Sequence, residues 1–211
     1  MNFRLDVLRL CLVTDSTLCG ERGVLAVVEA AVQGDVSCVQ LREKALDTRA
    51  FVERARALKA LLAPRGVPLI INDRVDVALA CGAEGVHVGQ SDMPPHDVRR
   101  LMPHALLGLS IETLAQLPAA ERAPVDYYGV GPVFPTGTKS DAAPALGLKG
   151  LGEIRAHTAR ALVAIGGIHA GNAAAVMAAG ADGVAVVSAV CAALDPAAAA
   201  RLLRGSMQRV G

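Results

Sequence analysis

Short apolar runs alternate with amphipathic or alanine-rich stretches along the chain, and this alternation limits the fold more than any other feature. The apolar runs predict strands near residues 8–13, 36–41, 68–71, 84–88, 106–109, 125–130, 161–165 and 183–187. The other stretches predict helices near residues 21–33, 47–63, 74–81, 95–101, 112–121, 149–157, 171–179 and 190–204. Repeated strand–helix units favour parallel strands with crossover helices, closed as one (β/α)₈ TIM barrel, an α/β domain over residues 1–211. A doubly wound open sheet is the alternative, but it would carry a glycine fingerprint where this chain has Thr14-Asp15-Ser16.

The composition fits one well-cored domain and limits the partners. The chain has 211 residues, of which 53% are hydrophobic, so two separate domains would be cramped. Its 21 basic and 20 acidic residues leave a net charge of +1, which gives no global field for nucleic acid or an anionic membrane. Any anion must therefore be bound locally. We expect small-molecule substrates, with no nucleic acid and no membrane partner, and the sequence leaves homo-oligomer formation open.

The cysteines and the N-terminus indicate a cytoplasmic protein. The five cysteines are scattered without a CxxC spacing, which favours free thiols in a reducing compartment over disulfides or a zinc site. Charges interrupt the first ten residues, so we predict no signal peptide. Residues 161–181 lack Asp, Glu, Lys and Arg, but Gly166-Gly167 and Gly171-Asn172 divide them into strand, loop and helix rather than a membrane span.

In a (β/α)₈ barrel the chemistry lies at the carboxyl ends of the strands. The second predicted strand ends in Gln40-Leu41-Arg42-Glu43-Lys44. Side chains alternate along a strand, so Gln40, Arg42 and Lys44 share one face and bring two cations and an amide together. Taken alone, the segment is equally well explained as a solvated strand end with ordinary surface charges.

Two carboxylates follow the third and fourth strands. Asn72-Asp73 comes after one strand and Gly89-Gln90-Ser91-Asp92 after the next, so Asp73 and Asp92 are expected to lie close together. Two carboxylates, water and a phosphate oxygen are the ligands that usually hold Mg²⁺. The structural alternative is that Asp73 caps the helix near residue 74 and Asp92 sits in the turn before Pro94-Pro95. One residue can serve both purposes.

The sixth strand opens into a loop with the composition of a phosphate site. Residues 126–141 read DYYGVGPVFPTGTKSD. Within them, Thr136-Gly137-Thr138-Lys139 offers two hydroxyls, an ammonium group and a backbone that the glycine leaves accessible. A solvated turn with a surface lysine would be the better interpretation of this tetrapeptide alone. Its position directly after a buried strand, in a chain that repeats this arrangement, favours anion binding.

The last two strands end in Gly166-Gly167 and Val187-Ser188, where backbone N–H groups can form the phosphate site common in such barrels. A tight turn is the alternative for the glycine pair. After the fifth strand, Ser110 as an N-cap and Glu112 as a first-turn acid would have a purely structural explanation. The five histidines form no ligand set, and no general-base histidine is indicated. Two anion sites, one with a metal, predict two phosphorylated substrates.

The motifs that carry these residues resemble the thiamine-phosphate synthase family. They are QLREK (40–44), IND (71–73), GVHVGQSDM (85–93), YGVGPVFPTGTKSDA (128–142), GLKGL (147–151), AIGGI (164–168) and ADGVAVVSAV (181–190). The resemblance runs from about residue 10 to residue 190 in order and spacing. It implies a (β/α)₈ barrel that joins 4-amino-2-methyl-5-(diphosphooxymethyl)pyrimidine to a thiazole phosphate, 4-methyl-5-(2-phosphooxyethyl)thiazole, with release of pyrophosphate.

The resemblance also implies roles for individual residues. The pyrimidine diphosphate is assigned Gln40, Arg42, Lys44, Asn72, Ser110 and Lys139, with Leu41 and Glu43 inside the same substrate-binding segment. The thiazole phosphate is assigned Thr136, Gly137, Thr138, Gly167, Val187 and Ser188. Mg²⁺ is assigned to Asp73 and Asp92. Many family members have a tyrosine in the first strand, where this chain reads LCLVTD at 10–15, so the wall of the pyrimidine pocket differs there.

The residue content agrees with the reaction that the resemblance implies. Pyrophosphate leaves from a benzylic-type carbon, and the thiazole nitrogen then captures the resulting cation. Such a step needs the leaving charge neutralised by Mg²⁺, Arg42, Lys44 and Lys139, and it needs no protein nucleophile or strong base. A thiazole tautomerase would share the phosphate site but need no diphosphate site, and a non-catalytic phosphate-binding barrel is excluded only by an assay.

Overall fold

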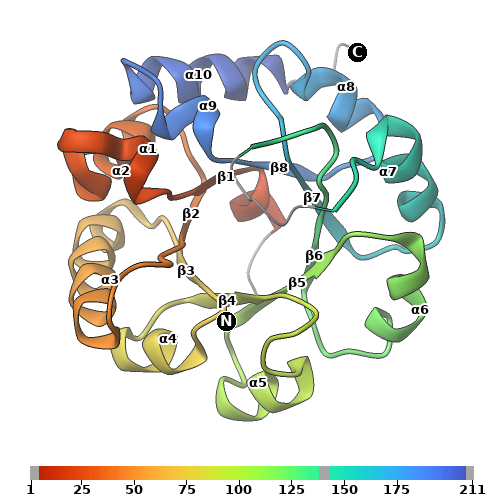
Figure 1. Cartoon of the computed structure of the whole chain (residues 1–211), viewed down its shortest axis with the longest axis horizontal. Coiled ribbons are helices and arrows are strands. Elements are labelled where there is room, and N and C mark those ends of the chain that lie inside the picture. The colour runs from red at the N-terminus through yellow and green to blue at the C-terminus, as the bar shows by residue number, and fades with distance from the viewer. Residues whose placement is uncertain (1–4, 138–142, 208–211) are drawn as a thin grey trace.

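The structure, a computed structural model, describes residues 5–137 and 143–207. All strand pairs are parallel, and β1 pairs with both β2 and β8, so the sheet closes on itself in the order β1 to β8 (Figure 1). The strands are β1 Leu10–Val13, β2 Cys38–Leu41, β3 Leu69–Asn72, β4 Gly85–Val88, β5 Leu106–Ile111, β6 Tyr127–Val130, β7 Ala161–Ile165 and β8 Gly183–Val186. The predicted single α/β domain with a (β/α)₈ barrel is therefore confirmed.

Helices surround the barrel, and one short helix lies across its middle in Figure 1. The α-helices are α1 Ser16–Cys19, α2 Gly23–Gln33, α3 Thr48–Leu62, α4 Val75–Cys81, α5 Pro95–Leu101, α6 Leu117–Ala120, α7 Gly147–Ala156, α8 Ala173–Ala178, α9 Ser188–Cys191 and α10 Pro196–Ser206. The 3₁₀ helices are η1 Leu5–Leu8, η2 Gly20–Arg22, η3 Ala63–Arg65 and η4 Leu114–Gln116. Within the described ranges, none of these helices has the length and apolar character needed to cross a bilayer.

One predicted helix is wrong in its extent. The stretch predicted as one helix over 190–204 contains two, because α9 ends at Cys191 and α10 begins at Pro196. The Asp195 carboxylate accepts a hydrogen bond from the Ala198 N–H at 2.9 Å and caps α10, while Pro196 occupies its first turn. The dipeptide Asp195-Pro196 is thus a start signal inside the predicted helix.

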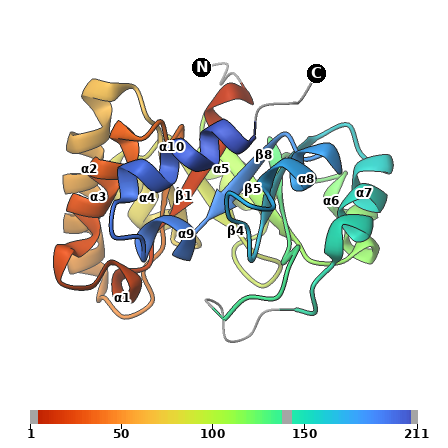
Figure 2. The same ribbon diagram turned by 90° about the horizontal axis from the view of Figure 1, so that it is seen from above.

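The barrel has an outer and an inner core. The outer core lies between strands and helices, and residues such as Leu41, Phe51 and Leu58 are fully buried there. The inner core fills the barrel below the strand ends, with Leu8 of η1, Cys11 and Tyr127 among its members. Figure 2 shows η1 at one end of the barrel and α1, which follows β1, towards the other. The inner core therefore closes the amino-terminal end and leaves the carboxyl end open.

Candidate active site

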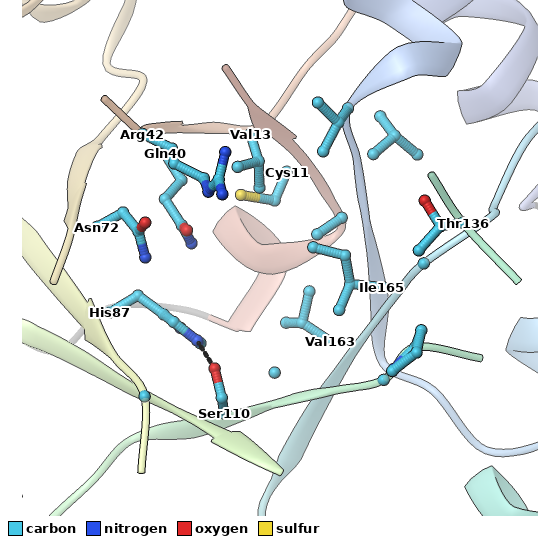
Figure 3. A pocket seen from close by; sticks show the side chains of 18 of the residues that line it. Cys11, Val13, Gln40, Arg42, Asn72, His87, Ser110, Thr136, Val163 and Ile165 are labelled. Carbon is cyan, nitrogen blue, oxygen red and sulfur yellow. Dashed lines mark hydrogen bonds between the residues drawn. The ribbon is translucent and has the colours of Figure 1, made fainter. Parts of the chain in front are cut away.

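A cavity of about 600 Å³ opens at the carboxyl ends of the strands (Figure 3). Every strand or the loop after it contributes to the lining, so the parallel closed sheet collects side chains that are far apart in the sequence. The predicted site residues that line it are Gln40, Arg42, Lys44, Asn72, Asp73, Asp92, Ser110, Thr136, Gly167, Val187 and Ser188. The prediction that the strand ends converge is confirmed for these positions.

Three predicted site residues that the structure describes do not line this cavity. Leu41 is fully buried in the outer core, and the Glu43 carboxylate is 1% exposed and forms an ion pair with Arg54 of α3. Gly137 is exposed outside the cavity lining. Thr138 and Lys139 lie outside the described residues. In the segment 40–44, the cavity is lined by Gln40, Arg42 and Lys44 but not by the two residues between them. Alternate side chains of this segment therefore point in opposite directions, as the pleat of a strand requires.

The β2 end presents an amide and two cations to the cavity. Gln40 is buried and faces the cavity beside Arg42 in Figure 3. The Arg42 N–H donates to Thr14 Oγ1 at 3.1 Å, and Arg42 Nη1 lies 3.9 Å from Asp15 Oδ2. Lys44 Nζ lies 2.7 Å from Asp73 Oδ2. The backbone of this strand end is therefore fixed by β1, while both cations keep exposed surface for a ligand.

The two predicted metal ligands meet as expected from neighbouring strands. Asp73 has a φ of 63°, and its Oδ1 accepts from Asn72 Nδ2 at 2.8 Å. Asp92 Oδ2 accepts from the Gly89 N–H at 2.6 Å. Burial and the nearby Asp73 carboxylate raise the pKa of Asp92, whereas the Gly89 N–H and Lys44 lower it. The pair is thus a concentrated negative site that a divalent cation would stabilise.

The structural alternative for these carboxylates is half right. Asp92 does close the turn that begins at Gly89. Asp73 does not cap α4, because that helix begins at Val75 and its N-cap residue, Arg74, makes no side-chain cap. Within residues 5–137 and 143–207, no group of three or more His, Cys, Asp or Glu side chains could hold a metal. A metal at Asp73 and Asp92 would therefore need water or substrate oxygens to complete its coordination shell.

Ser110 belongs to β5 rather than to a helix cap. The expected capping role is wrong, because Thr113 is the N-cap of η4 and forms a capping box with Gln116, so Glu112 precedes the helix. Ser110 Oγ instead lies 2.9 Å from His87 Nε2 (Figure 3), and Gln90 Nε2 donates to the Ser110 carbonyl at 2.6 Å. Both polar groups of Ser110 are therefore held at the cavity wall.

His87 and Tyr127 are cavity residues that sequence reasoning missed. His87 Nδ1 lies 3.0 Å from the Tyr127 hydroxyl, and both residues are buried on the inner face of the barrel. Burial lowers the pKa of His87 to about 4, so its imidazole is neutral near pH 7. The available signal was alternation along β4, since Gly85, His87 and Gly89 share the inward face.

The β7 and β8 ends present backbone rather than charged side chains. Gly166 and Gly167 have φ values of 99° and 63°, a region that favours glycine. A Cβ on Gly167 would lie 2.8 Å from both Phe134 Cβ and the Pro135 carbonyl oxygen. Asn172, which sequence reasoning missed, donates to the Gly167 carbonyl at 2.9 Å. The glycine pair thus makes a tight turn and also brings its backbone against the loop after β6.

Comparisons with known proteins show the family to which the chain belongs. Residues 10–190 match the family model for thiamine monophosphate synthase. The thiamine-phosphate synthase of Albidiferax ferrireducens is 60% identical over 202 residues, which cover 95% of this chain and 92% of that protein. The thiamine-phosphate synthase of Chloroflexus aurantiacus is 56% identical, with 93% and 91% covered. The structure of thiamine phosphate pyrophosphorylase from Pyrococcus furiosus superposes with a TM-score of 0.88 and 36% identity over 96% of each chain.

Proposed function

Because the chain belongs to the thiamine-phosphate synthase family, with its transferase activity in thiamine biosynthesis, we propose that the reaction takes place in the cavity at the strand ends. The proposed substrates are 4-amino-2-methyl-5-(diphosphooxymethyl)pyrimidine and 4-methyl-5-(2-phosphooxyethyl)thiazole. The products are thiamine phosphate and pyrophosphate. The observation that carries the proposal is one cavity with a cationic side-chain region at β2–β4 and a glycine-rich backbone region at β7–β8.

The β2–β4 region takes the pyrimidine diphosphate in this proposal. Arg42 and Lys44 neutralise phosphate oxygens, and Gln40 and Asn72 supply amide hydrogen bonds to the ligand. The support is that all four line the cavity and that the Arg42 N–H is bonded to Thr14, the residue after β1. Lys139 is assigned to the same substrate from its motif alone, since it lies outside the described residues.

Asp73 and Asp92 are the residues that would hold Mg²⁺. Their fit rests on two neighbouring carboxylates, of which Asp92 has a pKa raised by burial and by the charge of Asp73. Hard oxygen ligands of this kind suit Mg²⁺, which usually keeps water and phosphate oxygens in its shell. When bound, the ion would offset the negative charge that grows on the departing pyrophosphate.

The β6–β8 region takes the thiazole phosphate in this proposal. Thr136 and Ser188 each offer a hydroxyl, and both residues line the cavity together with Gly167. The positive φ of Gly167 forms a tight turn whose backbone N–H groups can bind phosphate oxygens, and the absence of a Cβ lets this turn pack against Phe134 and Pro135. Gly137, Thr138 and Val187 are assigned to the same phosphate from the family pattern, Thr138 being outside the described residues.

The proposed mechanism is a dissociative transfer. The bond between the pyrimidine methylene carbon and the diphosphate oxygen breaks, and its electron pair leaves with pyrophosphate. The aminopyrimidine ring stabilises the methylene cation, and the thiazole nitrogen then donates the pair that forms the new C–N bond. Arg42, Lys44 and Lys139 stabilise the leaving charge, which is the main requirement of such a step. The neutral His87 is not needed as a base, because no proton is removed.

A thiazole tautomerase-like reaction is the second candidate from the sequence, and the structure offers it no specific support. It would leave the β2–β4 side chains without a ligand. A phosphate-binding barrel without activity would bind both ligands and release no pyrophosphate.

The deciding experiment incubates the full chain with both substrates and Mg²⁺ and measures thiamine phosphate and pyrophosphate together. Equal amounts of the two products support the proposed transfer. Consumption of a thiazole tautomer without pyrophosphate would support the tautomerase, and binding without products would support the non-catalytic barrel. Omitting Mg²⁺ with EDTA present provides the control for the metal, and omitting each substrate in turn provides the control for contaminating hydrolysis.

A further inference from the structure

Three side chains on the inner faces of β4, β5 and β6 form a hydrogen-bonded line that ends in the cavity. The Tyr127 hydroxyl lies 3.0 Å from His87 Nδ1, and His87 Nε2 lies 2.9 Å from Ser110 Oγ (Figure 3 shows the second link). Ser110 is the member assigned to substrate above. Tyr127 and His87 have no role in the proposed mechanism, although both line the cavity.

The direction of these hydrogen bonds follows from the burial of Tyr127. The residue is 2% exposed, and among the described residues the only hydrogen-bond partner of its hydroxyl is His87 Nδ1. A buried hydroxyl hydrogen without an acceptor is costly, so the O–H donates to Nδ1. Nδ1 is then an acceptor, and the proton of the neutral imidazole lies on Nε2.

The consequence is a defined direction at Ser110. The Nε2–H of His87 donates to Ser110 Oγ, and the serine hydroxyl keeps its own hydrogen to donate elsewhere. Burial, which lowers the pKa of His87 to about 4, is consistent with a neutral ring. A protonated ring would also donate from Nε2, so the direction at Ser110 does not depend on the charge of His87.

Two glycines make the room for this line. A Cβ on Gly108 of β5 would lie 2.5 Å from the Tyr127 hydroxyl oxygen and would also collide with His87 Nδ1. A Cβ on Gly129 of β6 would lie 2.6 Å from His87 Cε1. Gly108 and Gly129 therefore lie beneath the rings of Tyr127 and His87, and only glycine at these two positions leaves the hydrogen bond between the rings intact.

We propose that Tyr127 and His87 are positioning residues that fix Ser110 as a hydrogen-bond donor to an acceptor atom of the pyrimidine diphosphate. This rests on the proposed function and on the family pattern, which assigns Ser110 to that substrate. Neither Tyr127 nor His87 has to touch the reacting atoms. Their effect is to prevent the serine hydroxyl from turning its hydrogen back towards the histidine, where it would present only lone pairs to the substrate.

The tautomer of His87 is the first test, and it uses the unmodified chain without ligand. Long-range ¹H–¹⁵N spectra of ¹⁵N-histidine-labelled protein distinguish a proton on Nε2 from one on Nδ1. The His87 signals are identified by their loss in His87→Gln. The proposal requires the Nε2–H tautomer near pH 7. A proton on Nδ1 would overturn it, because Nε2 would then accept from Ser110.

Ligand binding is the second test. Calorimetry with the pyrimidine diphosphate and Mg²⁺, without thiazole phosphate, compares wild type, Tyr127→Phe, Ser110→Ala and the double variant. Tyr127→Phe should raise the Kd about three- to tenfold, the size expected for one hydrogen bond that loses its orientation. The same substitution should add little in the Ser110→Ala background, because the group that it orients is already gone.

Tyr128→Phe is the matched control. Tyr128 is the next residue of β6, packs in the outer core, and has its hydroxyl bonded to Glu121 at 3.0 Å, so its loss should leave the Kd unchanged. If Tyr127→Phe raised the Kd equally in the wild-type and the Ser110→Ala backgrounds, the proposed positioning of Ser110 would be overturned and the effect would be assigned to packing. A wild-type chain that does not bind the pyrimidine diphosphate would instead overturn the proposed function. The tautomer spectrum would still decide whether His87 donates its hydrogen bond to Ser110.

Discussion

The two sides of the cavity are built from different parts of the chain. The β2–β4 side presents side chains, with Lys44 held against Asp73 at 2.7 Å and Asn72 bonded to the same carboxylate. The β7–β8 side presents backbone, with Gly166 and Gly167 in positive-φ conformations against the loop after β6. Ion pairs and hydrogen bonds hold the side chains of the β2–β4 side in place, whereas close packing against a neighbouring loop holds the backbone of the β7–β8 side.

This difference predicts different responses to substitution. A side chain on the β2–β4 side can be removed without moving the strand, because ladder bonds and the Arg42 N–H bond to Thr14 hold the backbone. A side chain added at Gly167 would push Phe134 and Pro135, and that loop leads directly to Thr136. Charge removal should therefore act on chemistry with little change in stability. Added volume should act on ligand affinity and on stability together.

The largest effect is expected from removing both carboxylates of the β2–β4 side. In Asp73→Ala, Asp92→Ala, kcat/KM should fall roughly 10³-fold or more, because metal stabilisation of a leaving group contributes several kcal/mol. Steady-state pyrophosphate release measures the effect. EDTA should abolish wild-type turnover and added Mg²⁺ should restore it.

The control for that variant is Asp76→Ala. Asp76 lies three residues after Asp73, on the exposed surface, and forms its ion pair with Arg74. Its loss should leave turnover near wild type, since the cavity lining does not include it. Full activity of the double variant in the presence of EDTA would remove the metal from the mechanism and leave the cations as the only charge stabilisation on that side.

The next effect concerns Lys139, which lies outside the described residues and is assigned from its motif to the diphosphate. Lys139→Met should lower kcat by roughly 10²-fold, because the lost ammonium interacts most strongly with charge that grows as pyrophosphate departs. Single-turnover and steady-state kinetics separate this from product release. If the substitution changed only the KM for thiazole phosphate, Lys139 would bind that substrate on the β7–β8 side. A charged side chain would then act on the side that presents backbone, and the two sides would not differ as proposed.

A smaller and more selective effect is expected at Gly167. Gly167→Val should raise the KM for thiazole phosphate roughly a hundredfold, since two charge-assisted hydrogen bonds would contribute about 3 kcal/mol. The structure adds a second expectation, because a residue with φ of 63° and a Cβ 2.8 Å from Phe134 Cβ is strained. A loss of about 1–3 kcal/mol in the free energy of unfolding should accompany the change in KM.

Gly171→Ala is the control for Gly167→Val. Gly171 is exposed in the same loop, has no positive φ, and its added Cβ would meet only the His169 side chain. Calorimetric binding of the pyrimidine diphosphate to Gly167→Val should stay close to wild type. Equal weakening of both ligands in a folded variant would show that the two sides do not bind separately.

The fold was accessible from the sequence because burial sets the strand–helix alternation, and a parallel sheet of this kind leaves few topologies. The convergence of Asp73 and Asp92 followed from the same argument, since neighbouring strands end at the same edge. The structural alternatives, a cap at Asp73 and a cap at Ser110, were wrong because the helices begin two to four residues later, at Val75 and Leu114. Local propensity does not fix such boundaries.

The line from Tyr127 to Ser110 was missed for a different reason. His87 is 40 residues from Tyr127 and 23 from Ser110, so its contacts depend on the register of three strands. Register is set by packing of the whole barrel, not by any local motif. Gly108 and Gly129 are visible in the sequence and make room for these contacts. Their role can be recognised only once the positions of the His87 and Tyr127 rings are known.

The smallest effect separates neighbouring residues of one strand end, Arg42 and Glu43. Arg42 faces the cavity, whereas the Glu43 carboxylate is buried against Arg54 outside it, although the family pattern includes both in the substrate-binding segment. Glu43→Gln should therefore leave both KM values within about twofold of wild type and lower the free energy of unfolding by about 1–3 kcal/mol. Arg42→Gln should do the reverse, raising the KM for the pyrimidine diphosphate roughly tenfold or more with little change in unfolding. Chemical denaturation and steady-state kinetics on the two variants measure both quantities. A large KM effect of Glu43→Gln with unchanged stability would mean that the segment binds substrate through both faces, and that the alternation along β2 does not divide ligand contact from packing.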